Sequence, residues 1–221
     1  NALMVSSTIL NNINKLAASA ELNKYGARFK YSKFLKVIDQ SHESITSNIT
    51  TVEMRRDLRL AIDQFAEYAI DFGNEFHISS MDGFNIRSTA FKVLDIPNNV
   101  YLYDLPNADR TTGTLGLFSL DAPGSTTPLI ERQNVGVVNY NTGRMTLNPI
   151  NIVSGKTKDG QQIMEISVVP ESNDVIGLQD LYLQLDTSNV EMVVDEIASG
   201  ADPSGSTYTV TSSYTERKIV R

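Results

Sequence analysis

Apolar residues at helical spacing open the chain, and a pattern typical of extended chain follows. Apolar positions recur every three or four residues over residues 6–22, which predicts an amphipathic helix with Ser6 or Ser7 as its N-cap. A second, shorter helix is expected over residues 32–40. Residues 41–56 are rich in serine and β-branched side chains, so we expect a strand there that begins after a few loop residues.

From residue 58 onward, short runs of alternating apolar and polar residues replace the helical pattern. Residues 58–68 also fit a helical face, but the alternation favours a strand that starts near Glu67. Asn141-Thr142-Gly143 lies between two such runs and predicts a β-hairpin, because Asn and Gly tolerate the positive φ of tight turns. Further strands are expected in FNIRSTAFKVL, NVYLYDL, GTLGLFSL, RQNVGVVNY, RMTLNPI, QQIMEISVVP, DLYLQLD, VEMVV and TYTVTSSYTER. Many short strands separated by turn signals are typical of an antiparallel β-sandwich.

These patterns predict an α+β fold with three parts. Residues 1–60 are expected to form a mixed α/β subdomain of helix, helix and strand, residues 61–198 an antiparallel β-sandwich-like domain, and residues 199–221 a C-terminal loop and extended strand. The strand near the end of the first part needs sheet partners, either upstream of Asn1 or later in the chain. Because the chain begins without methionine, we expect it to be a fragment of a longer protein.

Composition narrows the classes of function. The 221 residues are 41% hydrophobic and 20% charged, which is ordinary for a globular protein, and no apolar run is long enough to span a membrane. The absence of cysteine excludes disulfides and thiolate metal sites. The net charge of −7 argues against a general role in nucleic-acid binding. We therefore expect neither a nucleic acid nor a membrane among the partners.

Residues that could carry catalysis are sparse. His42 and His77 are the only histidines, and neither has a recognisable nucleophile and orienting acid around it; two histidines without cysteine also argue against a zinc site. Asp82-Gly83 and Asp159-Gly160 indicate ordinary turns rather than calcium loops. The chain also lacks the glycine motifs that bind phosphate. The sequence thus predicts a protein that is not an enzyme and holds no cofactor or metal.

Charge is distributed unevenly along the chain. Residues 1–60 contain nine Lys and Arg against five Asp and Glu, whereas the remaining residues contain ten against twenty-one. Between Leu22 and Ile38 every charged residue is basic: Lys24, Arg28, Lys30, Lys33 and Lys36. This basic run is either a solvated surface or a surface that contacts acidic residues, on the same chain or on another subunit. On another subunit, Asp195 and Glu196 are examples of such acidic residues.

Two stretches of the sequence resemble a known family. The first is LNKYGARFKYSKFLKVIDQSHESITSNITTVEMRRDL, residues 22–58, and the second runs from GFNIRSTAF through GVVNYNTGRMTL to VVPESNDV, within residues 83–175. Together they are similar to the C-terminal part of the large baseplate wedge protein of contractile-tailed (T4-like) bacteriophages, which is related to the baseplate J-like family. The resemblance implies a structural protein of the virion tail baseplate that is assembled in the host cytoplasm. It also implies that copies dimerise, join wedges into a ring around the tail tube and contact other wedge proteins.

Three surfaces are candidates for contacts between subunits. They are the helix face of Ile9, Ile13 and Leu16, the basic run, and the C-terminal alternation of Tyr208, Val210 and Tyr214, which could add to the sheet of a neighbouring chain. Each has an alternative: the helix face could pack on the chain's own sheet, the basic run could be solvated, and the C-terminal alternation could serve no contact.

A different function also fits a phage tail. A β-sandwich module that binds glycans or a host surface would need a pocket lined by exposed aromatic side chains. The nine tyrosines and eight phenylalanines leave this alternative open, although the lack of tryptophan weakens it. A hydrolase is the third alternative, and the sparse catalytic residues argue against it.

Overall fold

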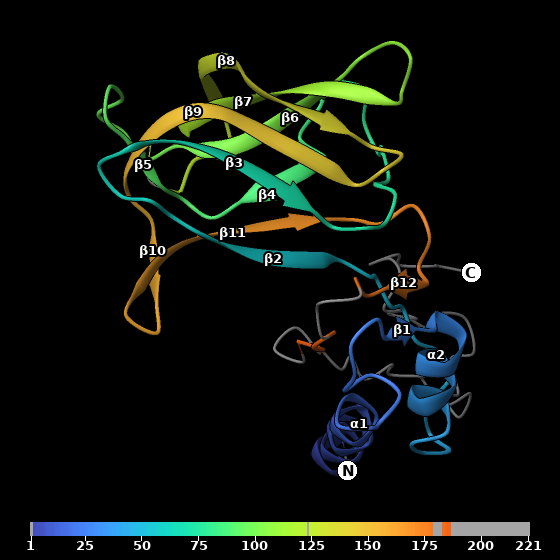
Figure 1. Cartoon of the computed structure of the whole chain (residues 1–221). Helices are drawn as coiled ribbons and strands as arrows, with labels where there is room; N and C mark the ends of the chain where they lie inside the picture. Colours follow the sequence, from blue (N-terminus) through green and yellow to red (C-terminus); the bar gives the residue numbers. More distant parts are fainter. Residues whose placement is uncertain (1, 123, 179–182, 187–221) are drawn as a thin grey trace, which may run out of the picture. The chain divides into compact units, whose positions relative to one another are not determined.

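The computed structural model describes residues 2–122, 124–178 and 183–186, and Figure 1 shows the course of the chain. The described residues divide into two compact units. The smaller unit comprises residues 2–19, 32–48 and 184–186, and the larger unit comprises residues 20–31 and 49–183 with the gaps given above. Both units therefore draw on the first sixty residues of the chain.

The smaller unit is built on two helices, α1 (Ala2–Ala17) and α2 (Tyr31–Asp39). α2 confirms the second predicted helix to within one residue at each end. The first predicted helix is also confirmed, but its expected ends are wrong, since α1 already includes Ala2 and stops at Ala17. Residues 18–22 form turns, and Leu22 belongs to the larger unit and is buried.

Val5, Ile9 and Ile13 form the buried face of α1. They are spaced four residues apart, so they share one side of the helix. The predicted N-cap at Ser6 or Ser7 is wrong, because Val5 extends the apolar face toward the N-terminus and places both serines inside the helix. The three buried side chains pack against partly buried apolar residues of the same unit: Phe34, Ile38, Ile45 and Leu185.

The larger unit contains a six-stranded antiparallel sheet in the order β3-β9-β8-β7-β6, with β5 paired to β9. The strands are β3 (Phe65–Asp71), β5 (Lys92–Val93), β6 (Tyr101–Pro106), β7 (Thr112–Leu120), β8 (Pro128–Asn139) and β9 (Arg144–Ser154). The strand favoured near Glu67 is confirmed, and residues 58–68 form no helix, because buried Tyr68 and Ile70 follow the alternation of a strand. The hairpin predicted at Asn141-Thr142-Gly143 connects β8 to β9.

A second sheet joins β10 (Lys156–Lys158), β11 (Gln161–Val168) and β2 (Met54–Arg59), and β4 (Ile86–Ser88) also pairs with β11. In Figure 1, β2 and β11 form a layer beside the six-stranded sheet. β2 is the strand expected in the first sixty residues, and its pairing with β11 shows that its partner lies later in the chain.

Apolar residues on the facing sides of the sheets form the core of the larger unit. Its most deeply buried side chains include Leu102, Leu115, Leu117, Met145, Leu147, Ile152, Met164 and Ile166. The predicted α+β class with an antiparallel β-sandwich-like domain is confirmed. A short third sheet pairs β1 (Arg28–Phe29) with β12 (Val175–Ile176), and neither of these strands was predicted.

The strands expected toward the C-terminus lie partly or wholly outside the described residues. The strands expected in VEMVV and TYTVTSSYTER lie outside the described residues, as does the whole of the expected C-terminal part, residues 199–221. Residues 183–186, the described end of DLYLQLD, form no strand. Neither of the two described helices combines the length and the apolar character that crossing a lipid bilayer requires.

Candidate assembly surfaces

The predicted helix face is largely internal to its unit. Ile9 and Ile13 are 8% and 2% exposed and pack against α2, whereas Leu16 is half-buried. The face is thus covered by the chain itself, chiefly by the second helix and not by a sheet, which the alternative expected. A contact between subunits through this face stays a prediction, and Leu16 is the residue most open to it.

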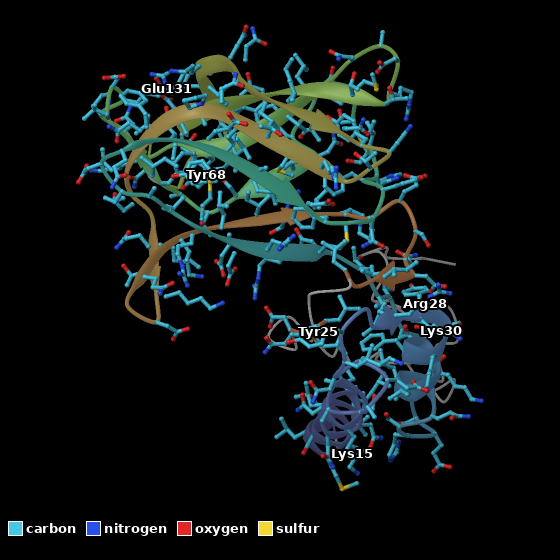
Figure 2. The ribbon with its side chains drawn as sticks, in the orientation of Figure 1. Lys15, Tyr25, Arg28, Lys30, Tyr68 and Glu131 are labelled. Carbon is cyan, nitrogen blue, oxygen red and sulfur yellow. The ribbon has the colours of Figure 1, made fainter. Side chains whose placement is uncertain are left out.

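All five members of the basic run are exposed, but they do not belong to one unit. Lys24, Arg28 and Lys30 lie in the larger unit, and Figure 2 shows Arg28 and Lys30 close together. Lys33 and Lys36 lie on α2 in the smaller unit. The structure therefore places three of the five charges on one body, and the contact with an acidic neighbour stays a prediction.

Arg28 also borders a surface depression of about 280 Å³ in the larger unit. Carboxylates of the same unit line it, which reduces the net positive charge around Arg28: Glu75, Glu171 and Asp174. Asp174 additionally accepts a hydrogen bond from the backbone N–H of Tyr31 at 2.8 Å. The depression is a mixed-charge surface rather than a purely basic one.

The two histidines have structural partners. His77 Nδ1 lies 2.8 Å from Glu171 Oε2 beside a second depression of about 270 Å³, and His42 Nδ1 accepts a hydrogen bond from the backbone N–H of Ser44. Among the described residues, no group of three or more His, Cys, Asp or Glu side chains is arranged to hold a metal ion. His42 Nδ1 also lies 2.7 Å from the Ser44 hydroxyl, two residues away at an exposed position, and the partners described for His42 include no carboxylate that would orient its ring for catalysis.

The C-terminal candidates Tyr208, Val210 and Tyr214 lie outside the described residues, and so do the acidic candidates Asp195 and Glu196.

A buried polar network fixes one end of the sandwich. Asp104 on β6 is fully buried, and its carboxyl group accepts hydrogen bonds from the Ile86 N–H (2.8 Å), the Asn85 side chain (2.9 Å) and the Tyr140 hydroxyl (2.6 Å). Burial, the hydrogen bond to Asp104 and the charge of Asp104 together raise the pKa of Tyr140 above its usual range. Asp104 thus joins the segment before β4 to the turn after β8.

The outer face of the six-stranded sheet carries an uncharged row that crosses five strands. Cross-strand pairing places these residues side by side, in the order Leu105, Thr114, Val137, Thr146 and Ala69. Directly paired residues point to the same side of an antiparallel sheet. Leu105 is 44% and Val137 56% exposed, and Ala69 is also exposed. We call this row the uncharged strip.

An aromatic cluster covers the same face beside the uncharged strip. Phe84 stacks on Tyr103 with ring centroids 5.1 Å apart and meets Phe118 edge-on at 5.3 Å, while Tyr101 stacks on Phe118. Gly116 leaves the room that Tyr103 needs, because a Cβ there would lie 2.4 Å from the ring. Phe84 remains 37% exposed. The cluster and the uncharged strip lie next to each other on this face.

The N-terminal part of the chain is similar to a known protein family. Residues 2–57 match a phage baseplate family. The family model is described as baseplate structural protein gp6, C-terminal domain III, and the match ends within β2. It covers about a quarter of the chain and includes α1, α2 and nearly all of the first resembling stretch, whereas the second stretch lies outside it. A search of curated proteins found no match.

The gp6 match confirms the predicted class, a structural protein of a bacteriophage virion, and the predicted location in the tail baseplate. Sequence reasoning missed two features of the fold that bear on contacts: the buried network around Asp104 and the uncharged strip. A signal for the strip was present, because the outer positions of β6, which alternate with buried Leu102 and Asp104, hold the large residues Tyr101, Tyr103 and Leu105.

Proposed function

We propose that the chain is a non-enzymatic structural subunit of a baseplate wedge in a contractile-tailed phage. In this role copies dimerise and join neighbouring wedges into a ring around the tail tube, in contact with other wedge proteins. The kinship of the larger wedge protein to the baseplate J-like family is part of the same proposal. The observation that carries it is the match of residues 2–57 to the gp6 C-terminal domain.

The charge distribution supports assembly through unlike surfaces. A ring closes only through a heterologous contact, in which two different patches of one chain meet. The chain has a basic N-terminal part and a strongly acidic remainder, and Lys24, Arg28 and Lys30 are exposed on the larger unit. We propose that these cations, with Lys33 and Lys36, contact acidic residues of a neighbour. The half-buried Leu16 and the C-terminal Tyr208, Val210 and Tyr214 are the apolar candidates.

Molar mass in solution tests the proposal. The chain is passed through size-exclusion chromatography with light scattering over a series of protein and salt concentrations. A dimer or larger species is expected; its weakening by salt would implicate the basic run, and its persistence in salt would implicate apolar contacts. A chain that stays monomeric at every concentration and binds no phage tail component would contradict the proposal.

A further inference from the structure

The uncharged strip is narrow, and its size limits what can bind there. On one side runs a polar row of paired residues: Thr112, Asn139, Arg144 and Asp71. Arg144 Nε and Asp71 Oδ2 form an ion pair at 2.6 Å within that row. On the other side, the aromatic cluster stands beside the part of the strip that lies on β6 and β7. The strip is therefore one residue wide and four strand spacings long, or about 19 Å.

These dimensions suit a single extended segment better than a flat surface. A stable contact between two folded surfaces buries about 800 Å² on each partner, and a strip one residue wide offers much less uncharged area. An extended chain rises about 3.3 Å per residue, so seven residues cover the length of the strip.

Both edge strands of the six-stranded sheet, β6 and β3, are protected against pairing with a further strand. The free edge of β6 is covered, because the backbone N–H of Phe84 donates to Asp104 O at 3.1 Å and that of Leu102 donates to Ser88 Oγ. The edge strand β3 has exposed Glu67 and a register shift next to it. Charged side chains and irregular pairing are the usual means by which edge strands avoid adding another strand.

The C-terminal sequence holds a segment with matching chemistry. Thirty-five residues follow Asp186, and no charged residue occurs between Asp202 and Glu216. Within this stretch, residues 208–214 read YTVTSSY, which combines aromatic and β-branched residues that favour extended chain. The distance from Tyr208 to Tyr214 in an extended chain is about 20 Å, equal to the length of the strip.

We propose that residues 208–214 of one copy bind along the uncharged strip of a neighbouring copy. No charge loses its hydration in this contact, and the hydroxyl groups of Thr114 and Thr146 can hydrogen-bond to the backbone of an extended segment. Residues 187–207 can span up to about 70 Å, so the segment reaches a second molecule. Because each copy gives a segment and receives one, the contact is heterologous. The inference rests on the proposed function, since it names the surfaces through which copies associate.

Cross-linking tests this pairing directly, because the chain has no cysteine of its own. One preparation of the full chain carries Val137→Cys, a second carries Val210→Cys, and each has a different tag; the two are mixed and oxidised. A disulfide-linked heterodimer is expected. The matched control replaces Val137→Cys by Thr126→Cys in an exposed loop, and loss of the heterodimer is expected there.

Three outcomes would overturn the inference. Homodimers of V137C alone would show that two strips meet each other, and a link confined to one copy of a V137C/V210C chain would show that the segment binds its own molecule. Absence of any link would show that the strip does not receive the segment. If light scattering still finds oligomers in that case, the proposed function stands while this inference fails.

A second test uses charge in place of a covalent link. V137K and V210K should each lose self-association, whereas an equal mixture should form a pair through its one intact contact. The exposed loop variant T126K should associate like the unmodified chain. A mixture that stays as weakly associated as its components would contradict the pairing.

Discussion

Asp104 shows how a single side chain holds separate segments together. Its carboxyl group is fully buried and accepts three hydrogen bonds, all from uncharged donors. The donor Asn85 is itself satisfied, because its side-chain oxygen accepts from Ser79 and Ser80 and its nitrogen also donates to the Ser80 carbonyl. A fully satisfied buried network of this kind favours one arrangement of the chain over its competitors.

Replacing Tyr140→Phe removes one of these three hydrogen bonds and nothing else of comparable size. Asp104 then keeps a buried oxygen with one donor fewer, so the free energy of unfolding should fall by about 1–3 kcal/mol. Urea denaturation followed by circular dichroism measures this change, since the chain has no tryptophan. Tyr101→Phe is the control, because Tyr101 is only half-buried and its ring stacking is kept. Equal loss in both variants would contradict the role of the network.

The same tyrosine gives stability a dependence on high pH. The pKa of Tyr140 is raised in the folded chain, by burial above all and then by Asp104, whereas the unfolded chain titrates near the ordinary 10.0. Above this pH the unfolded state releases a proton that the folded state keeps, so the free energy of unfolding falls as pH rises. Below pH 10, Tyr140 makes its full contribution to the free energy of unfolding. Y140F should therefore decline less steeply between pH 9.5 and 11 than the unmodified chain, and parallel curves would exclude the effect.

At the scale of elements, the β8–β9 hairpin depends on the shape of its turn. Gly143 has φ +67°, and a Cβ there would lie 2.0 Å from the carbonyl oxygen of Asn74. The Gly143 carbonyl also accepts a hydrogen bond from the Phe72 N–H. The turn thus serves as a docking point for the segment that follows β3, in addition to reversing the chain.

Comparing Gly143→Ala with Gly160→Ala separates the cost of the positive φ from the cost of the close approach to Asn74. Gly160 has a similar φ of +75° but no atom within 4 Å of a new Cβ, so G160A should cost only the left-handed backbone, about 1–2 kcal/mol. G143A must also displace the Asn74 backbone and should cost at least about 1 kcal/mol more. Chemical denaturation of the two variants measures the difference, and equal costs would show that the close approach is relieved easily.

The packing of α1 supports a further prediction. Ile13 is 2% exposed within its own unit, so Ile13→Ala should lower the free energy of unfolding by about 2–5 kcal/mol, as buried isoleucines usually do. Leu3→Ala, at an 81% exposed position of the same helix, should change it by less than about 0.5 kcal/mol. If I13A instead changed molar mass and left unfolding unaffected, Ile13 would belong to a contact between subunits.

Local periodicity was enough to predict most elements of this fold. α2 and strands such as β3 and β7 follow their apolar spacing closely. The β10 strand has the sequence Lys-Thr-Lys and is exposed throughout, so no apolar pattern marks it, and two-residue strands such as β1 are too short for any period. The uncharged strip and the Asp104 network depend on register between distant strands, which a local pattern does not contain.

At the scale of the whole molecule, we expect the exposed cations of the basic run to strengthen self-association. Removing two cations by Lys24→Gln with Lys30→Gln should weaken self-association about threefold to tenfold at low salt, since exposed ion pairs contribute about 0.2–1 kcal/mol each. The difference should shrink near 0.5 M salt because of screening. Arg87→Gln with Lys92→Gln, also exposed, makes the same change in net charge elsewhere. Sedimentation velocity compares the pairs, and equal weakening would assign the effect to net charge alone.

The division of the chain into two interleaved units has a mechanical consequence. The chain passes from one unit to the other four times, after residues 19, 31, 48 and 183. A force that pulls the units apart is therefore carried by four covalent tethers in parallel, whereas a single linker would bear the whole load. A protease cut in one tether leaves three intact. For a part of the proposed tail machinery, such redundancy keeps the two bodies attached under strain without requiring a rigid joint between them.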